Sequence, residues 1–437
     1  CAGSDMCMRV WSFLDSALQG VKSGAIPVAV IDEAVARILR LKFRLGLFEN
    51  PRFVDYQKRA AIVGCAAHHA LALRAARESA VLLKNTGILP LRLDVVREIA
   101  VIGPNADDDL NQLGDWSLGA GQNQGVMQRN DRACTKTILY GMVATFGEEA
   151  KITYAQGCGG QRGQTEKIAR AVRLAEQADV VVLALGDQLP FIGEGHSTAT
   201  LELQGGQNEL FEALVATGTP IVVVFISSKP LVISHIAERA EAVLCVFNPG
   251  MEGGVAIAEI IRGQVAPQGR LTVSFPNHVG QQPVYYNQTG GAHHHDYPDL
   301  PGKGFFGLYP FGYGLTYTTF KYSEPVLAKP SFAHGETVKV SIEVRNSGSR
   351  DAVETVQVYF CDCVSSVTWP RKNLIAFRKV PLKSGELKKV AFELPPESFA
   401  IVNGRCERVV ESGEFELMIG KSSRDMDLKK VRFSIGK

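Results

Sequence analysis

The sequence predicts an α/β domain with a mostly parallel sheet, followed by an all-β domain of immunoglobulin or fibronectin type. Two patterns indicate this architecture. From residue 80 to about 280, short apolar runs alternate with amphipathic helical stretches, as in a parallel sheet covered by helices on both faces. From residue 326 onward, apolar and polar residues alternate with period two between turn signals, as in a β-sandwich. The length of 437 residues also favours two or three domains over a single core.

Two helices are expected before the sheet begins. Apolar residues recur at helical spacing from 31 to 45, and Gly46 suits the end of that helix. A second, alanine-rich helix is expected from 59 to about 79. Within the sheet domain, the predicted strands are 98–102, 151–154, 180–185, 221–226 and 242–247, and the predicted helices are 166–178, 207–215 and 253–262.

The segment 278–325 interrupts this alternation. It is rich in Gly, Pro, Tyr and His, which indicates a long ordered loop or linker. The period-two runs that follow it are VKVSIEVRNSG, TVQVYFCD, KKVAFELP and GEFELMIG. Turn signals such as Ser384-Gly385 separate these runs, so several short antiparallel strands are expected.

Composition narrows the range of partners. A net charge of +2 with 21% charged residues gives no electrostatic reason to expect nucleic acid or an anionic membrane. No apolar run is long enough to span a bilayer. The chain begins Cys1-Ala2-Gly3, without an initiator Met or a leader, as if cut from something longer. The missing signal peptide therefore says nothing about the compartment.

Three features that could suggest a cofactor or a metal are better explained otherwise. The nine cysteines match no zinc-binding spacing, so scattered reduced thiols are expected. His293, His294 and His295, followed by Asp296, could bind a metal, but adjacent loop histidines rarely converge on one ion. The glycine-rich run 157–163 has arginine where a dinucleotide-binding loop needs its third glycine. We therefore expect neither metal nor cofactor.

Glu194 is the most informative polar residue. It lies between Gly193 and Gly195 in the loop after the predicted strand 180–185, and open α/β sheets bind ligands at the carboxyl ends of their strands. A carboxyl group so placed can protonate a leaving-group oxygen and then deprotonate water. Spacing alone favours an ordinary solvated loop carboxylate. The nearest alternative acids in the sequence are Asp187 and Glu202.

A family resemblance covers residue 2 to the end. The sequence resembles the C-terminal two-thirds of the β-glucosidase group in glycoside hydrolase family 3. The matching segments, in family order, include AGSDMCM (2–8), IDEAVARILRLKFRLGLFENP (31–51), ARESAVLLKNTGILPL (76–91), IAVIGPNAD (99–107), LGDWS (113–117), GEGHS (193–197), NPGMEGGVAIAEII (248–261) and PQGRLTVSFP (267–276).

The resemblance implies a domain plan. The sandwich of α-helices and parallel strands would cap a (β/α)₈ barrel, of which only the last strand and helix remain at the N-terminus of this chain. The implied parts are 1–50 for the end of the barrel, 51–79 for a linking helical region, 80–310 for the α/β sandwich domain, 311–325 for a linker and 326–437 for a fibronectin type III-like domain.

The resemblance also implies a shared active site. In the family, a barrel aspartate is the nucleophile, and its motif lies upstream of AGSDMCM, so the nucleophile is not expected in this chain. An ungapped match from 186 to 207 gives Glu194 the acid/base role, although Ala199 stands where the family often has arginine. The residues expected to contact the sugar are Asp5, Met6 and Met8 at the barrel mouth, and Asp115 and Trp116, of which Trp116 could equally be a core residue.

The activity implied for the parent enzyme is hydrolysis of terminal, non-reducing β-D-glycosidic bonds with retention. Its substrate would be a small oligosaccharide or an aryl or alkyl glycoside, and the chain alone would be catalytically incomplete. Alternatives are a β-xylosidase or arabinosidase specificity, a non-catalytic sugar-binding or scaffold module, and an incomplete sequence of an ordinary enzyme. The resemblance favours a periplasmic or secreted location, and a homodimer stays open.

Overall fold

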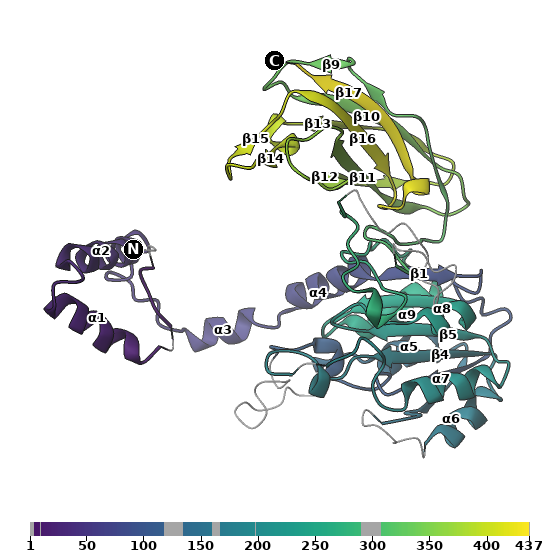
Figure 1. Ribbon diagram of the computed structural model, residues 1–437. Coiled ribbons are helices and arrows are strands. Elements are labelled where there is room, and N and C mark those ends of the chain that lie inside the picture. Colours follow the sequence, from purple (N-terminus) through teal and green to yellow (C-terminus); the bar gives the residue numbers. More distant parts are fainter. Residues whose placement is uncertain are drawn as a thin grey trace. The chain divides into compact units, whose positions relative to one another are not determined.

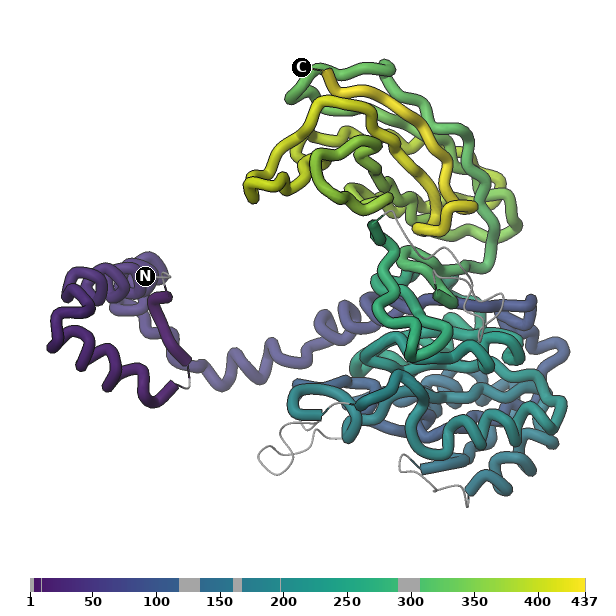
Figure 2. Tube along the Cα trace, in the orientation of Figure 1, coloured from purple at the N-terminus to yellow at the C-terminus, as the bar shows by residue number. Residues whose placement is uncertain are grey.

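The computed structural model describes residues 4–8, 10–117, 134–159, 167–196, 198–289 and 307–436. The chain divides into two compact units, Cys1–His68 and His69–Lys437, which are described separately below. Figure 1 labels most of the helices and strands, and Figure 2 follows the chain from one terminus to the other. No helix among the described residues is long and apolar enough to cross a membrane.

The first unit is helical. Its helices are α1 (Ser12–Lys22), α2 (Val28–Arg44) and α3 (Tyr56–Ile62). Helix α2 confirms the predicted helix 31–45 and begins three residues earlier, directly after Pro27. The barrel strand expected near the N-terminus is wrong for the described residues of 1–50, which form no strand. A parallel strand needs hydrogen-bonding neighbours, and this unit contains none among those residues.

The single helix expected from 59 to 79 is two helices. Helix α3 ends at Ile62 and α4 runs over Ala66–Ser79. Between them Gly64 has φ +71°, a left-handed conformation that glycine adopts readily and that interrupts a right-handed helix. The side chain of Asp55 starts α3 by accepting hydrogen bonds from the backbone N–H groups of Gln57 and Lys58. Alanine content predicted the helical state but not the interruption.

The second unit begins with a six-stranded sheet in the order β1-β6-β5-β4-β2-β3. Five strands are mutually parallel and confirm the predicted strands within a residue or so. They are β2 (Glu98–Ile102), β3 (Lys151–Ala155), β4 (Val180–Gly186), β5 (Ile221–Ile226) and β6 (Ala242–Phe247). Strand β1 (Val81–Asn85), which the sequence pattern did not predict, pairs antiparallel with β6.

Helices cover both faces of this sheet (Figure 1). On one face, α6 (Ile168–Ala175), α7 (Gln207–Val215) and α8 (Ser234–Arg239) contribute to one apolar core. On the other face, α5 (Ile138–Phe146) and α9 (Gly253–Arg262) contribute to a second core. Strands β4 and β5 are buried along their whole length, which explains why their sequences are continuous apolar runs.

The C-terminal part of the second unit is a β-sandwich with a core between two sheets. Buried and exposed residues alternate as predicted in the long strand Val338–Asn346, whereas Ala352–Asp362 is buried along most of its length. The described residues after 330 form no α-helix. The strands are β7 (Phe320–Tyr322), β8 (Val326–Leu327), β9 (Ser331–Phe332), β10 (Val338–Asn346), β11 (Ala352–Asp362), β12 (Asn373–Leu382), β13 (Leu387–Leu394), β14 (Ile401–Val402), β15 (Arg408–Val409), β16 (Gly413–Gly420) and β17 (Leu428–Ile435).

The fold class is therefore the predicted one, and a further local difference lies before the β-sandwich. The segment 311–325, expected to be a linker, contains β7, which pairs with the end of β10. Three residues are too few for a period-two pattern to be visible in the sequence. The longer loop expected from 278 contains a short 3₁₀ turn over Val279–Gln281, and its residues 290–306 lie outside the described part of the chain.

Candidate active site

The carboxyl edge of the parallel sheet has a topological switch point between β2 and β4. From β2 the chain passes through α5 to β3, whereas from β4 it passes through α7 to β5 on the other side. Helices α5 and α7 pack on opposite faces of the sheet. The loops after β2 and β4 therefore leave the sheet in opposite directions, and open α/β folds bind ligands in the crevice that such loops form.

Glu194 is placed on an exposed turn of the loop that follows β4. The turn is closed by the backbone N–H of His196, which donates to the carbonyl of Gly193 over 3.1 Å. Gly195, the third residue of the turn, has φ +78°, a conformation that favours glycine there. Glu194 is solvent-exposed. The glycine pair noticed in the sequence thus serves a tight turn that presents the glutamate outward.

The base of this loop is fixed by Gln207, a fully buried residue at the start of α7. Its Oε1 accepts from the backbone N–H of Gly186 over 2.8 Å, and its Nε2 donates to the carbonyl of Gly186 over 2.9 Å. The same Nε2 donates to the carbonyl of Gln204 over 2.8 Å. The side-chain amide therefore joins the last residue of β4 to the beginning of α7, and the segment between them has fixed ends.

We expect Gln207→Glu to lower the free energy of unfolding by about 2–4 kcal/mol, because a carboxylate keeps the shape of the amide but cannot donate to the two carbonyls. Urea denaturation of both proteins would measure this difference. Gln177→Glu, at an exposed position, makes the same chemical change and should leave stability nearly unchanged. Equal losses in the two variants would contradict the bracing role of Gln207.

The two alternative acids lie in different surroundings. Asp187 is 3% exposed and its Oδ1 lies 2.8 Å from the Nζ of Lys229, while its Oδ2 accepts from the backbone N–H of Ser228 over 3.1 Å. This carboxylate joins the loop after β4 to the loop after β5 and is not placed to meet a substrate. Glu202 is exposed, beside Phe191 and Asn208 on a cavity of about 600 Å³.

Asp115 and Trp116 lie in the loop after β2, and the structure brings Asp115 to Glu194. The Oδ2 atom of Asp115 accepts a hydrogen bond from the backbone N–H of Glu194 over 3.1 Å. Trp116 is 67% exposed, so it is not a core residue. Its φ of +57° is an outlier for a bulky side chain, and such outliers concentrate at functional sites.

Asp5, Met6 and Met8 belong to the first unit. Asp5 forms an ion pair with Arg37, its Oδ1 lying 2.6 Å from Nη2, and the Arg37 guanidinium lowers the pKa of Asp5. Met6 and Met8 are exposed. The ion pair gives Asp5 a structural contact that the sequence pattern did not suggest. Sugar contacts by these three residues stay a prediction.

A buried amide network, missed in the sequence, joins the loops of the switch point. Asn111 donates from Nδ2 to Oδ1 of Asn105 over 2.9 Å and accepts from the backbone N–H of Leu189 over 3.0 Å. Asn248, after β6, donates to the carbonyl of Asn111 over 3.2 Å. Gln112 donates to the carbonyl of Gly250 over 2.9 Å. The available signal was Asn248, which directly follows the wholly apolar strand β6.

The metal and cofactor expectations can be compared only with the described residues. No group of three or more His, Cys, Asp or Glu side chains in that part could hold a metal ion. The histidine run at 293–295 and most of the glycine-rich run 157–163 lie outside it. The eight described cysteines are free thiols, and burial raises the pKa of Cys158 and of Cys245 to about 12.

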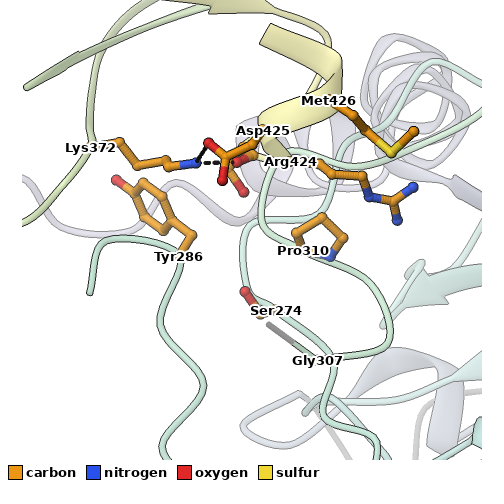
Figure 3. A pocket seen from close by; sticks show the side chains of 9 residues that line it. Ser274, Tyr286, Gly307, Pro310, Lys372, Arg424, Asp425 and Met426 are labelled. Atoms are coloured by element: carbon orange, nitrogen blue, oxygen red, sulfur yellow. Dashed lines mark hydrogen bonds and ion pairs between the residues drawn. The ribbon is translucent and has the colours of Figure 1, made fainter. Parts of the chain in front are cut away.

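A smaller cavity of about 240 Å³ is lined by residues of the segment 274–310 and of the β-sandwich (Figure 3). The Nζ of Lys372 lies 2.7 Å from Oδ1 of Asp425 and donates to the carbonyl of Ser423 over 2.9 Å. The ring of Tyr286 stacks on Phe311, with centroids 4.2 Å apart. None of the described lining residues belongs to the loops after β2 or β4, so this cavity is not part of the candidate active site.

Comparison with known proteins agrees with this fold. Residues 80–317 match the family model described as the glycosyl hydrolase family 3 C-terminal domain, and residues 354–423 match a fibronectin type III-like domain. These matches define the class as a chain that carries a glycosyl hydrolase family 3 C-terminal domain followed by a fibronectin type III-like domain. The first match covers more than half of the sequence, and the chain belongs to glycosyl hydrolase family 3.

Two curated relatives show that the family includes enzymes named for different sugars. The chain is 39% identical over 415 residues to a β-xylosidase of Formosa agariphila, covering 93% of this chain and 55% of the relative. It is 35% identical over 455 residues to a periplasmic β-glucosidase of Salmonella typhimurium, covering 97% of this chain and 58% of the relative. The chain thus spans just over half the length of these relatives.

Solved structures show the same likeness. A β-glucosidase involved in saponin metabolism from intestinal bacteria is 41% identical, with a TM-score of 0.91, and the match covers 99% of this chain and 63% of that one. A β-glucosidase from Listeria innocua in complex with isofagomine is 31% identical, with a TM-score of 0.88, covering 100% of this chain and 59% of that one.

Proposed function

We propose that this chain supplies the acid/base part of the active site of a retaining β-glycosidase. The observation that supports this most directly is the position of Glu194. Its carboxyl group is exposed on a tight turn at the switch point of the sheet, in a segment that matches the family in sequence. A general acid must reach the leaving-group oxygen of a substrate, and an outward-facing loop carboxyl can do so.

The proposed reaction has two steps. First, a barrel aspartate, implied by the family resemblance, attacks the anomeric carbon while Glu194 gives its proton to the departing oxygen. Then Glu194, now a carboxylate, takes a proton from water, which attacks the glycosyl ester and releases the aspartate. Retention follows from these two inversions and requires the two carboxyl groups to lie about 5–5.5 Å apart. The reaction uses neither a metal nor a cofactor.

Trp116 is proposed as a platform for the part of the substrate that departs. Its indole is exposed beside Asp115, which contacts the turn of Glu194. Sugars and aryl groups both stack on aromatic rings, so the residue suits glycoside leaving groups of either kind. We expect Trp116→Ala to raise KM for oligosaccharides by about 10-fold, equivalent to about 1.4 kcal/mol. The KM for a methyl glycoside should change little. An unchanged KM for both substrates would show that Trp116 does not stack on the leaving group.

The substrate class is a β-glucoside or a β-xyloside, because the relatives named above include enzymes of both kinds. The test is to join this chain to the N-terminal segment of a family relative and to measure hydrolysis of 4-nitrophenyl glucoside, xyloside and arabinopyranoside. We expect a single preferred sugar, released first as the β-anomer in proton NMR spectra. Hydrolysis near background by the chain alone is expected. Sugar binding without hydrolysis by the joined protein would instead support a non-catalytic module.

A periplasmic or secreted location is part of this proposal, since one relative is named as periplasmic. Glycosides outside the cytoplasm would then be its substrates. Association into a homodimer stays a prediction, and sedimentation of the purified protein would test it.

A further inference from the structure

The carboxylate of Asp115 lies directly against the turn that presents Glu194. Besides the hydrogen bond from the Glu194 N–H, the backbone of Gly193 approaches the same carboxylate closely. A Cβ atom built on Gly193 would lie 2.0 Å from Oδ2 and 2.1 Å from Cγ of Asp115, closer than any two such atoms can come. Gly193 is therefore required by the position of Asp115 as well as by its own φ of +96°.

The backbone before and after Asp115 is held by hydrogen bonds. The 3₁₀ turn Asn111–Leu113 just before it belongs to the buried amide network, and Asn111 and Gln112 are both buried. After it, the hydroxyl of Ser117 donates to the carbonyl of Gly114 over 2.9 Å. The backbone on both sides of Asp115 is therefore fixed. A carboxylate on a fixed backbone can hold a neighbouring turn in one position, which one on a flexible segment could not.

The second carboxylate oxygen of Asp115 is unusual. Oδ1 is buried and has no hydrogen-bond partner in the described part of the chain. Burying an acceptor without a donor opposes folding. The charge is therefore not explained by stability, whereas a charged acceptor makes a stronger hydrogen bond to the backbone N–H of Glu194 than a neutral one would.

We propose that Asp115 is a positioning residue that fixes the turn of Glu194 in its working geometry. This inference rests on the proposed acid/base role of Glu194. Asp115 then acts through the backbone of the turn and not by holding a sugar hydroxyl, as the family resemblance had suggested. Proton donation by a general acid depends on reaching within hydrogen-bond distance of the leaving oxygen, so loosening the turn slows that step.

The first experiment is independent of catalysis and uses the present chain. Amide hydrogen exchange of Glu194 should be about 10-fold faster in Asp115→Ala, because a charge-assisted hydrogen bond to that N–H is lost. Asp115→Asn, which keeps an acceptor oxygen, should show a smaller change. The amide of Gly218, which bonds to the carbonyl of Val215 just after α7 and away from this turn, serves as the internal reference. Unchanged exchange at Glu194 in Asp115→Ala would overturn the proposal.

The second experiment compares substitutions of two glycines in the family-length enzyme, which is this chain joined to the N-terminal segment of a family relative. Gly193 and Gly195 both have positive φ, +96° and +78°, so alanine strains the backbone at either position. Among the described residues, only the alanine at 193 would also displace Asp115, because none of them lies within 4 Å of a Cβ at 195 apart from its chain neighbours. We expect Gly193→Ala to reduce kcat for an alkyl glycoside about 10-fold more than Gly195→Ala does.

Leaving groups separate positioning from a merely structural role. In Asp115→Ala, kcat/KM for an alkyl glycoside should fall about 10- to 100-fold, whereas kcat/KM for a dinitrophenyl glycoside, whose first step needs no protonation, should fall far less. Equal losses on both substrates would show general damage and refute positioning. If Glu194→Ala itself shows no difference between the leaving groups, the acid/base assignment is wrong instead, so the two failures are distinguishable.

Discussion

In the family-length enzyme, Glu194→Ala is expected to reduce hydrolysis of alkyl glycosides by about 10²–10⁴-fold, the usual contribution of a positioned general acid. The carboxyl group is exposed on a turn at the switch point, where a leaving-group oxygen could approach it. A substrate with an acidic phenol leaving group needs little protonation, so its first step should be much less affected. Values of kcat/KM for alkyl and dinitrophenyl glycosides, which report the first step, measure the two cases.

The second half of this prediction concerns the general base. Without Glu194, water is no longer deprotonated as it attacks the glycosyl-enzyme, so the intermediate should accumulate with the dinitrophenyl substrate. Azide needs no deprotonation and should restore turnover, giving a β-glycosyl azide. Glu202→Ala, an exposed glutamate of the same loop, is the matched control and should keep near-normal rates. If Glu194→Ala hydrolysed alkyl glycosides at the wild-type rate, Glu194 would be an ordinary surface carboxylate and not the general acid.

The sequence was sufficient for the parts of the fold that depend on local pattern. Strands β4 and β5 are buried on both faces, so their continuous apolar runs identify them. Helices α7 and α9 were predicted at their observed bounds because their apolar residues recur at helical spacing between glycine-rich turns. Strand β10 of the sandwich was visible because one of its faces packs on the core and the other meets solvent.

Features that depend on contacts distant in sequence could not be predicted. Strand β1 is short, and its place in the sheet comes from pairing with β6, some 160 positions later in the chain. The loop of Glu194 was found from its flanking glycines, but its partner Asp115 lies 79 positions earlier in the sequence. The expectation that Asp115 contacts sugar came from its motif, which says nothing about which group its carboxylate faces.

Large effects on stability are expected at a buried ion pair of the second unit. Glu354 in β11 is 1% exposed, and its Oε2 lies 3.1 Å from Nη2 of Arg270. Its Oε1 accepts from the hydroxyl of Tyr322 over 2.8 Å. Arg270 precedes the β-sandwich in sequence and follows the parallel sheet, so this cluster joins the two parts of the unit. Removing Arg270 leaves the Glu354 carboxyl group buried without its ion-pair partner.

We expect Arg270→Ala to lower the free energy of unfolding at neutral pH by about 3–5 kcal/mol, the usual cost of breaking a buried pair. Burial raises the pKa of Glu354, and Arg270 and the Tyr322 hydroxyl oppose that rise. Without Arg270, burial acts with less opposition and the pKa of Glu354 should rise further. The folded protein would then keep a proton that the unfolded chain releases, so stability should fall as pH rises above the ordinary range of a glutamate.

The slope of this fall is about 1.4 kcal/mol per pH unit for one proton, until the pH passes the pKa of Glu354 in the folded state. Urea denaturation of Arg270→Ala between pH 5 and 8, followed by circular dichroism, would measure it. Arg92→Ala removes an arginine from an exposed pair with Asp94 and should change stability little at any pH. Adding Glu354→Gln to Arg270→Ala should abolish the slope, because no carboxyl group is left to titrate. A slope that survives in this double variant would mean that another group causes the pH dependence.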